Sequence, residues 1–225
     1  MKSQKSAFTL YIILSGIFIS SLVTCNLIFQ KFFNINILGY QTQLSVGLLA
    51  YPITFLVTDV ISEIFGQKKA QQVVIAGFCA AIFTFIVITI SSKIPSFKDS
   101  PVNDQIFSQV FGLTGPAVLA SMTAYLIAQY IDVRIFHFWK RITKGKHLWI
   151  RNNFSTIPSQ TIDSCTVIGI LVLAKVFSIN QFIPLVVGAL LFKIVVAAID
   201  TIPLYIIVNY IRKKYKLKKG EEINL

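Results

Sequence analysis

Apolar residues are grouped along the chain into six long blocks that are separated by short polar segments. The blocks cover residues 8–29, 44–65, 73–90, 112–131, 157–177 and 183–208. A helix needs about 20 mostly apolar residues to cross the hydrocarbon core of a bilayer, and a slightly longer block crosses with some tilt. The pattern therefore predicts an all-α integral membrane protein with six transmembrane helices.

The composition agrees with a membrane protein. Of the 225 residues, 55% are hydrophobic and only 13% are charged, and the mean hydropathy is +0.71. A soluble domain has about 45–50% apolar and about 25% charged residues. The six blocks use most of the chain, so we expect a single transmembrane domain over residues 1–225. The first block exceeds the apolar stretch of about 7–15 residues in a secretory signal, and we expect it to remain as a helix.

Basic residues indicate how the chain is oriented. Sixteen of the 21 lysines and arginines lie before the first block, in alternate loops, and in the tail 212–225, whereas the other loops hold four. Cytoplasmic loops of membrane proteins are enriched in lysine and arginine, so both termini are predicted to be cytoplasmic. We expect the basic tail to meet lipid headgroups and predict no nucleic-acid partner.

Acidic residues occur inside the apolar blocks, where they are expensive. Five of the nine lie in or at the ends of predicted helices: Asp59, Glu63, Asp132, Asp163 and Asp200. In the predicted orientation Asp59, Asp163 and Asp200 each lie roughly 9–12 Å from a cytoplasmic helix end. A charge in the bilayer usually faces a partner or a cavity, so we predict that these groups converge on a ligand. The alternative is that each carboxylate only joins neighbouring helices.

Glu63 and Asp132 are predicted to support charge or to gate the inner exit. Glu63 is one helical turn closer to the cytoplasm than Asp59, so we expect Lys68, Lys69 and water to stabilise its charge. Neutralising an interfacial group of this kind should have a mild effect. Asp132 lies at the inner end of its predicted helix, with Gln129 about one turn deeper.

Two further polar groups complete the candidate site. Gln160 precedes Asp163 by three positions in the polar stretch 155–166, so the two can share one helix face. Lys193 lies inside the last block and needs an acidic partner, for which Asp200 on the same helix and Asp59 are the candidates.

Catalytic signatures are weak in this chain. The sequence has only two histidines and lacks an HExxH motif, a GxSxG motif and a glycine loop for phosphate. We therefore predict neither an enzyme nor a bound metal or cofactor. Binding and translocation of a small polar solute fits the buried polar groups better.

Four segments carry a resemblance to a known family. They are "FLVTDVISEIFG" (55–66), "SMTAYLIAQYIDVRIF" (121–136), "RNNFSTIPSQTIDS" (151–164) and "FKIVVAAIDTIPLY" (192–205). With these segments in this order, the chain resembles the queuosine precursor transporter family, also called the vitamin uptake transporter family. The resemblance implies a six-helix protein of the bacterial inner membrane that imports a 7-deazaguanine precursor such as preQ0 or preQ1, or queuine, for tRNA modification.

A 7-deazaguanine suits the candidate residues. A carboxylate accepts the N–H groups at N1 and the 2-amino group, while Gln129, Gln160 or Lys193 can donate to O6. Phe55 or Tyr125 is placed to offer a flat ring an aromatic platform. Two other functions stay open: the substrate-binding subunit of an energy-coupling-factor vitamin importer, and a non-transporting membrane enzyme or assembly factor.

Overall fold

Helices make up most of the computed structural model, which describes residues 2–37, 39–112, 115–173, 175 and 177–224. The helices are α1 (Lys2–Ile28), α2 (Tyr51–Phe65), α3 (Gln67–Ser91), α4 (Asp104–Phe111), α5 (Gly115–Ile142), α6 (Leu148–Leu173) and α7 (Phe182–Tyr215). Two antiparallel strands, β1 (Phe32–Ile37) and β2 (Tyr40–Ser45), pair as a hairpin in which Phe32 lies opposite Ser45. Short 3-10 turns precede α2 and α7, at Val46–Leu49 and Ile179–Gln181.

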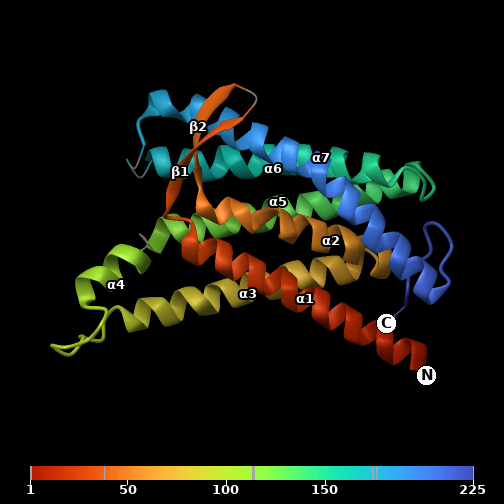
Figure 1. Ribbon diagram of the computed structural model, residues 1–225, viewed down its shortest axis with the longest axis horizontal. Helices are drawn as coiled ribbons and strands as arrows, with labels where there is room; N and C mark the ends of the chain where they lie inside the picture. Colours follow the sequence, from red (N-terminus) through yellow and green to blue (C-terminus); the bar gives the residue numbers. More distant parts are fainter. Residues whose placement is uncertain (1, 38, 113–114, 174, 176, 225) are drawn as a thin grey trace.

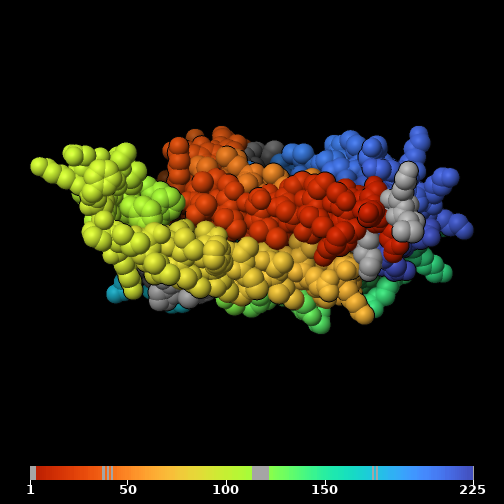
Figure 2. All heavy atoms as spheres, turned by 90° about the horizontal axis from the view of Figure 1, so that it is seen from below, coloured from red at the N-terminus to blue at the C-terminus, as the bar shows by residue number. Residues whose placement is uncertain are grey.

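Six long helices run back and forth to form an elongated bundle (Figure 1). Both termini lie at one end, together with the turn between α2 and α3 and the turn between α5 and α6; we call this the termini end. The hairpin and α4 lie toward the opposite end, which we call the hairpin end. Figure 2 shows α1 and α3 side by side across one face of the bundle, with the segment around α4 projecting beyond it.

Among the described residues, five helical segments are long and apolar enough to cross a membrane. They are Gln4–Ile28, Val46–Phe65, Gln67–Ser91, Leu148–Leu173 and Ile179–Tyr215. The helical membrane architecture predicted from the apolar blocks is confirmed to this extent. Helix α5 has 28 residues and packs against α3 and α6, but it is less apolar and is not among the five. Six crossings and cytoplasmic termini stay predictions.

Several helix ends differ from those that the apolar blocks predicted. Helix α5 continues to Ile142, α6 begins at Leu148 instead of residue 157, and α7 continues to Tyr215. The added turns are rich in polar residues. Their hydropathy is that of a loop, although they are helical. The hairpin and α4 were not predicted, and β2 occupies the start of the second block.

Helix α2 is the central element of the bundle. It packs against α1, α3, α5 and α7, and its residues are buried almost without interruption from Thr54 to Phe65. Pro52 lies in its first turn, where a missing N–H is tolerated. Gly66, with φ of 86°, joins α2 directly to α3 in a backbone conformation that favours glycine. The carboxylates of α2 are therefore held at the centre of the molecule.

Helix α6 presents a polar face to the interior. Its buried residues recur every three or four positions and are Leu148, Arg151, Asn152, Ser155, Thr156, Ser159, Gln160, Asp163, Ser164 and Ile168. This spacing places them on one face, which packs against α5 and α7. Asn152 donates to the carbonyl of Ala197 and to the hydroxyl of Thr201, both on α7. The inward face of α6 is thus mostly polar.

Candidate functional site

A cavity of about 460 Å³ lies between the helices toward the hairpin end. It is lined by residues of α1, the hairpin, α2, α3, α5, α6 and α7. Its volume lies within the range of about 300–1,000 Å³ that is typical of small-molecule sites. Most of the lining is apolar, and charged groups enter it only from Asp163 and Lys193 among the lining residues described. The cavity is therefore an apolar space with one charged region.

That charged region is a buried ion pair between α6 and α7. The Lys193 Nζ lies 2.8 Å from Asp163 Oδ2 and also 2.8 Å from the Ser164 Oγ. The Tyr51 hydroxyl donates to the same Asp163 oxygen at 2.7 Å, and the Lys193 ammonium lies 4.9 Å from the centre of the Tyr51 ring. Asp163 Oδ1 is buried and has no hydrogen-bond partner in the part of the chain that the structure describes. Asp163 Oδ1 can therefore accept a hydrogen bond from a molecule in the cavity.

Three aromatic rings pack next to this ion pair. The ring centroids of Tyr51 and Tyr125 are 5.3 Å apart, those of Tyr51 and Phe55 are 5.4 Å apart, and those of Phe55 and Tyr125 are 6.4 Å apart. Tyr51 and Tyr125 line the cavity, whereas Phe55 packs behind them. Of the two predicted platform residues, the structure brings Tyr125 to the cavity wall.

A second polar group, the mid-bundle cluster, consists of Asp59, Gln129, Asp132 and Gln160. All four are buried, and none of them lines the cavity. The Gln129 Nε2 donates to the Thr58 Oγ1 at 3.3 Å, and the Ser159 Oγ donates to Asp132 Oδ1 at 3.0 Å. Gln160 also borders a narrow crevice between α6 and α7 that reaches Lys193. The cluster therefore lies between the cavity and the termini end.

A third polar group, the Glu63 network, lies at the termini end. The Glu63 carboxylate is fully buried and pairs with Arg151 at 2.9 Å, with Lys140 at 3.6 Å, and with Arg212. Lys140 also donates to the backbone carbonyls of Ser62 and Glu63. Its ammonium lies 2.8 Å from the carboxylate of Glu222, which belongs to the segment after α7. The network joins α2, α5, α6, α7 and that segment.

The predicted surroundings of Glu63 were wrong. Lys68, Lys69 and water were expected to stabilise it at the surface, but the side chain is fully buried and its partners come from other helices. The reason is that α6 and α7 extend further toward the termini end than the apolar blocks indicated. This extension carries Arg151 and Arg212 into the helices and turns them inward.

The prediction of one shared layer for Asp59, Asp163 and Asp200 was also wrong. Asp163 bonds to Tyr51, which precedes Asp59 by eight positions on α2, or about 12 Å along the helix. The early start of α6 places Asp163 further from the termini end than predicted. Asp200 is half-buried on α7, and no hydrogen bond or ion pair to it is found within the described residues. The acids are therefore distributed along the bundle.

The predicted pairing of Lys193 is confirmed, but with a different partner. Neither Asp200 nor Asp59 pairs with it; the partner is Asp163. Two turns along α7 is too long a reach for Lys193, whereas Asp163 lies directly across the α6–α7 contact. Tyr51 and Arg151 were missed as site residues. The three- and four-residue spacing of polar positions on α6 continues back to Arg151 and could have revealed it.

Metal ligands do not gather in this molecule as far as it is described. No group of three or more histidine, cysteine or acidic side chains that could hold a metal ion occurs among the described residues. The side chains around the cavity offer hydrogen bonds, an ion pair and aromatic contact. Such an arrangement is suited to holding a small polar molecule.

The bundle and its buried polar groups are those of a multi-pass membrane protein. The family model described as "Putative vitamin uptake transporter" matches residues 45–208, and the chain belongs to this family. The resemblance carried by the four sequence segments is thereby confirmed, as is a place in the bacterial membrane. No solved structure matches the chain.

Two curated bacterial proteins are similar to the chain. The "Probable queuosine precursor transporter" of Bacillus subtilis (strain 168) is 29% identical over 122 residues, which are 53% of this chain and 52% of the relative. The "Probable queuosine precursor transporter" of Haemophilus influenzae (strain ATCC 51907 / DSM 11121 / KW20 / Rd) is 25% identical over 183 residues, which are 79% of this chain and 74% of the relative. The match thus spans about half the length of the Bacillus protein.

Proposed function

We propose that this protein transports a 7-deazaguanine precursor of queuosine, such as preQ0 or preQ1, into the cell for tRNA modification. Membership of the vitamin uptake transporter family and the names of the two relatives support transport of this class of solute. The observation that carries the proposal is the buried Asp163–Lys193 pair at the wall of a 460 Å³ cavity, with one carboxylate oxygen unused.

The ion pair offers the hydrogen bonds that a 7-deazaguanine needs. Asp163 Oδ1 is free to accept from the N1–H or the 2-amino group of the base. Lys193 and Ser164 can donate to O6, since an ammonium carries three N–H donors. The rings of Tyr51 and Tyr125 provide flat apolar contact beside these groups. The apolar remainder of the cavity takes the faces and edges of the base that form no hydrogen bonds.

The other polar groups mark a route through the bundle. In this proposal, Gln160 receives the solute after it leaves the cavity, and Asp59, Gln129 and Asp132 lie beside this route without binding the solute. The Glu63 network closes the termini end in this proposal, because its fully buried carboxylate joins Arg151, Lys140 and Arg212 from three other helices. The cavity then faces outward, and transport requires the network to open.

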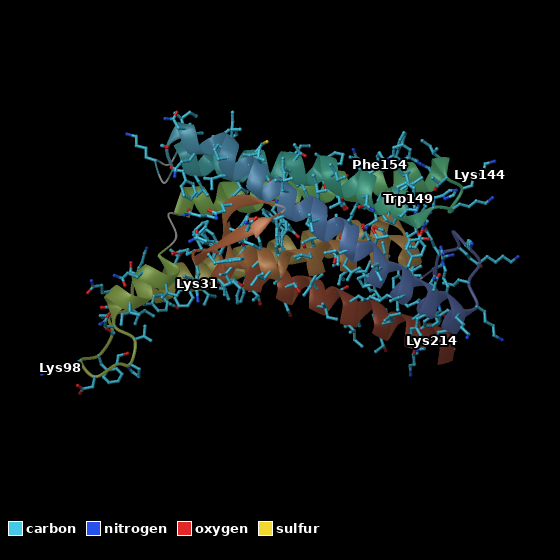
Figure 3. The ribbon with its side chains drawn as sticks, turned by 45° about the horizontal axis from the view of Figure 1, so that its top comes forward. Lys31, Lys98, Lys144, Trp149, Phe154 and Lys214 are labelled. Atoms are coloured by element: carbon cyan, nitrogen blue, oxygen red, sulfur yellow. The ribbon has the colours of Figure 1, made fainter. Side chains whose placement is uncertain are left out.

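This orientation is tested by the accessibility of single cysteines. In a variant whose three native cysteines are replaced by serine, cysteine is introduced at Lys98, Lys144 or Lys214. Figure 3 shows Lys144 and Lys214 at the termini end and Lys98 at the opposite end. A membrane-impermeant thiol reagent added to whole cells should label position 98 and spare 144 and 214. Labelling of 144 or 214 from outside would contradict cytoplasmic termini.

Transport is tested by uptake of preQ0 or preQ1 into cells that can neither make nor import queuosine precursors. Expression of the chain should restore queuosine in tRNA, and Asp163→Asn should abolish this at equal protein abundance. Asp99→Asn, in an exposed loop, is the matched control and should restore queuosine fully. Purified protein in liposomes should also take up the solute without an ATPase. Failure of the wild-type chain in both assays would refute the proposal.

A further inference from the structure

Asp59 has an unusual environment, even among buried carboxylates. Its side chain is only 1% exposed, and neither of its two oxygens has a hydrogen-bond partner among the described residues. Placing an ionised carboxylate in a membrane interior costs several kcal/mol unless a partner compensates the charge. Glu63, one turn away on the same helix, has three cations. Of these two neighbouring acids, one is therefore surrounded by cations and the other has no direct partner among the described residues.

Other unused oxygen atoms surround Asp59. Ser62 follows it by three positions on α2, and the Ser62 hydroxyl is buried without a partner in the described structure. The Gln129 Nε2 donates to Thr58, which brings the Gln129 side chain from α5 to this part of α2; its Oε1 has no partner in the same set of residues. Two carboxylate oxygens, a hydroxyl and an amide oxygen are therefore available to one bound species.

Asp132 adds a second negative charge from α5. It is fully buried and is anchored by hydroxyl groups of α6, with Ser159 donating at 3.0 Å. Asp132 and Asp59 act on each other electrostatically, and both are acids. Because like charges in a low dielectric repel strongly, the two carboxylates cannot both be ionised there without an added positive charge.

The cations of the bundle do not meet this need. The charged groups that act on Asp59 are Glu63 on α2, Asp132 on α5, Arg151 on α6 and Asp200 on α7. Lys140 on α5 and Arg212 on α7 lie at Glu63, one turn along α2, and His137 lies near Lys140. Arg151, Lys140 and Arg212 are all held by Glu63. Helices α1 and α3 pack apolar residues such as Phe18 and Val74 into the same core as α2. Arg151 attracts Asp59 only at longer range, and no cation forms an ion pair with Asp59 among the described residues.

We propose that Asp59, with Ser62, Gln129 and Asp132 around it, binds one monovalent cation, a proton or Na⁺, that is coupled to transport. A single positive charge neutralises the excess negative charge, and the available oxygens suit either species. The coupling role rests on the proposed function, whereas the binding of the cation does not. Tyr51 and Asp59 are two turns apart on α2, so this helix connects the Asp163 pair at the cavity with the cation site.

Binding of the cation is tested without any transported solute. Infrared spectra of the purified protein are recorded between mildly acidic and mildly alkaline pH, with and without NaCl. The carbonyl band of a protonated carboxylic acid should be lost on raising the pH and should be absent from Asp59→Asn. If the bound species is Na⁺, NaCl at constant pH should alter the carboxylate bands in wild type but not in this variant. Asp99→Asn should keep the wild-type response. If no band that responds to pH or Na⁺ depends on Asp59, the proposal is wrong.

Coupling is tested in liposomes by comparing accumulation with equilibrium exchange of labelled preQ1. A proton or Na⁺ gradient should drive accumulation by the wild-type protein, and Asp59→Asn should lose accumulation but keep exchange. Asp163→Asn should lose both. If wild-type accumulation ignores both gradients, or if Asp59→Asn loses exchange as well, coupling at Asp59 is refuted. If the wild type exchanges no 7-deazaguanine, the proposed function fails, while the infrared measurement still decides the cation site.

Discussion

The Glu63 network and the Asp163–Lys193 pair are built from the same types of residue but differ in how fully they are paired. Glu63 has Arg151, Lys140 and Arg212 around one carboxylate and is not among the residues that line the 460 Å³ cavity. Asp163 has one cation and one tyrosine hydroxyl on the same oxygen, and its other oxygen is unused. The cavity lies next to the incompletely paired group.

This difference indicates which buried charges hold the bundle together and which await a ligand. Each oxygen of Glu63 faces at least one cation, although Oε2 accepts no hydrogen bond among the described residues, so the charge of Glu63 is already compensated and its main effect is on stability. A carboxylate with a free oxygen beside a cavity can recognise a solute. The substitutions below separate stability from uptake at each group, beginning with the largest expected effect.

Glu63→Gln should destabilise the protein most. It leaves Arg151, which is fully buried, without its carboxylate, and breaking a buried ion pair costs about 3–5 kcal/mol. We expect a large fall in abundance and in the melting temperature of the detergent-solubilised protein. This revises the mild effect that a surface position for Glu63 implied. A melting temperature equal to that of Asp99→Asn would show that the network does not stabilise the termini end.

Lys193→Met should lower both abundance and uptake, because it leaves Asp163 buried beside an apolar side chain. Adding Asp163→Asn removes the unpaired charge, so the double variant should regain abundance but not uptake. A double-mutant cycle on melting temperature measures the coupling between the two residues. Adding Asp200→Asn instead should rescue nothing. Rescue by Asp200→Asn and none by Asp163→Asn would contradict the observed pairing.

Tyr51→Phe should have an intermediate effect. It keeps the ring that contacts Lys193 and Tyr125 but removes the hydroxyl that donates to Asp163 at 2.7 Å. A hydrogen bond to a charged group contributes about 1.5–3 kcal/mol. We expect the KM for uptake to rise about tenfold, while the abundance of the protein stays close to that of the wild type. Tyr210→Phe, at an exposed position on α7, is the control and should leave KM unchanged.

Glu222→Gln should have the smallest effect. The Glu222 side chain is 39% exposed, and a partly exposed ion pair contributes about 0.2–1 kcal/mol. Lys140 keeps its bonds to the carbonyls of Ser62 and Glu63 in this variant. The melting temperature should fall slightly at low salt and equal that of the wild type at high salt. A fall in melting temperature as large as that of Glu63→Gln would show that Glu222 stabilises the protein as strongly as the buried network does.

The sequence predicted the helical membrane fold because apolar runs long enough to cross a bilayer are typical of transmembrane helices and uncommon in soluble domains. It also identified Asp163 and Lys193 as buried charges that need partners. It could not assign the partners, since the α6–α7 and α2–α6 contacts join residues that are far apart in the chain. Helix ends were misplaced where polar residues such as Arg151 and Asn152 lie inside a helix. Hydropathy reports how polar a segment is, but it does not report whether its polar side chains point into the bundle.

The hairpin of β1 and β2 has a consequence for how such proteins change during evolution. It contributes Phe32, Gln43, Leu44 and Ser45 to the cavity wall, and its two strands are held by backbone pairing. Backbone pairing tolerates most side chains, so single mutations there can reshape the cavity without disturbing the helices. In a buried ion pair, by contrast, replacing one residue leaves its partner unpaired, so both residues must change together. Divergence of solute preference among relatives is therefore expected to begin in the hairpin, with the charged interior retained.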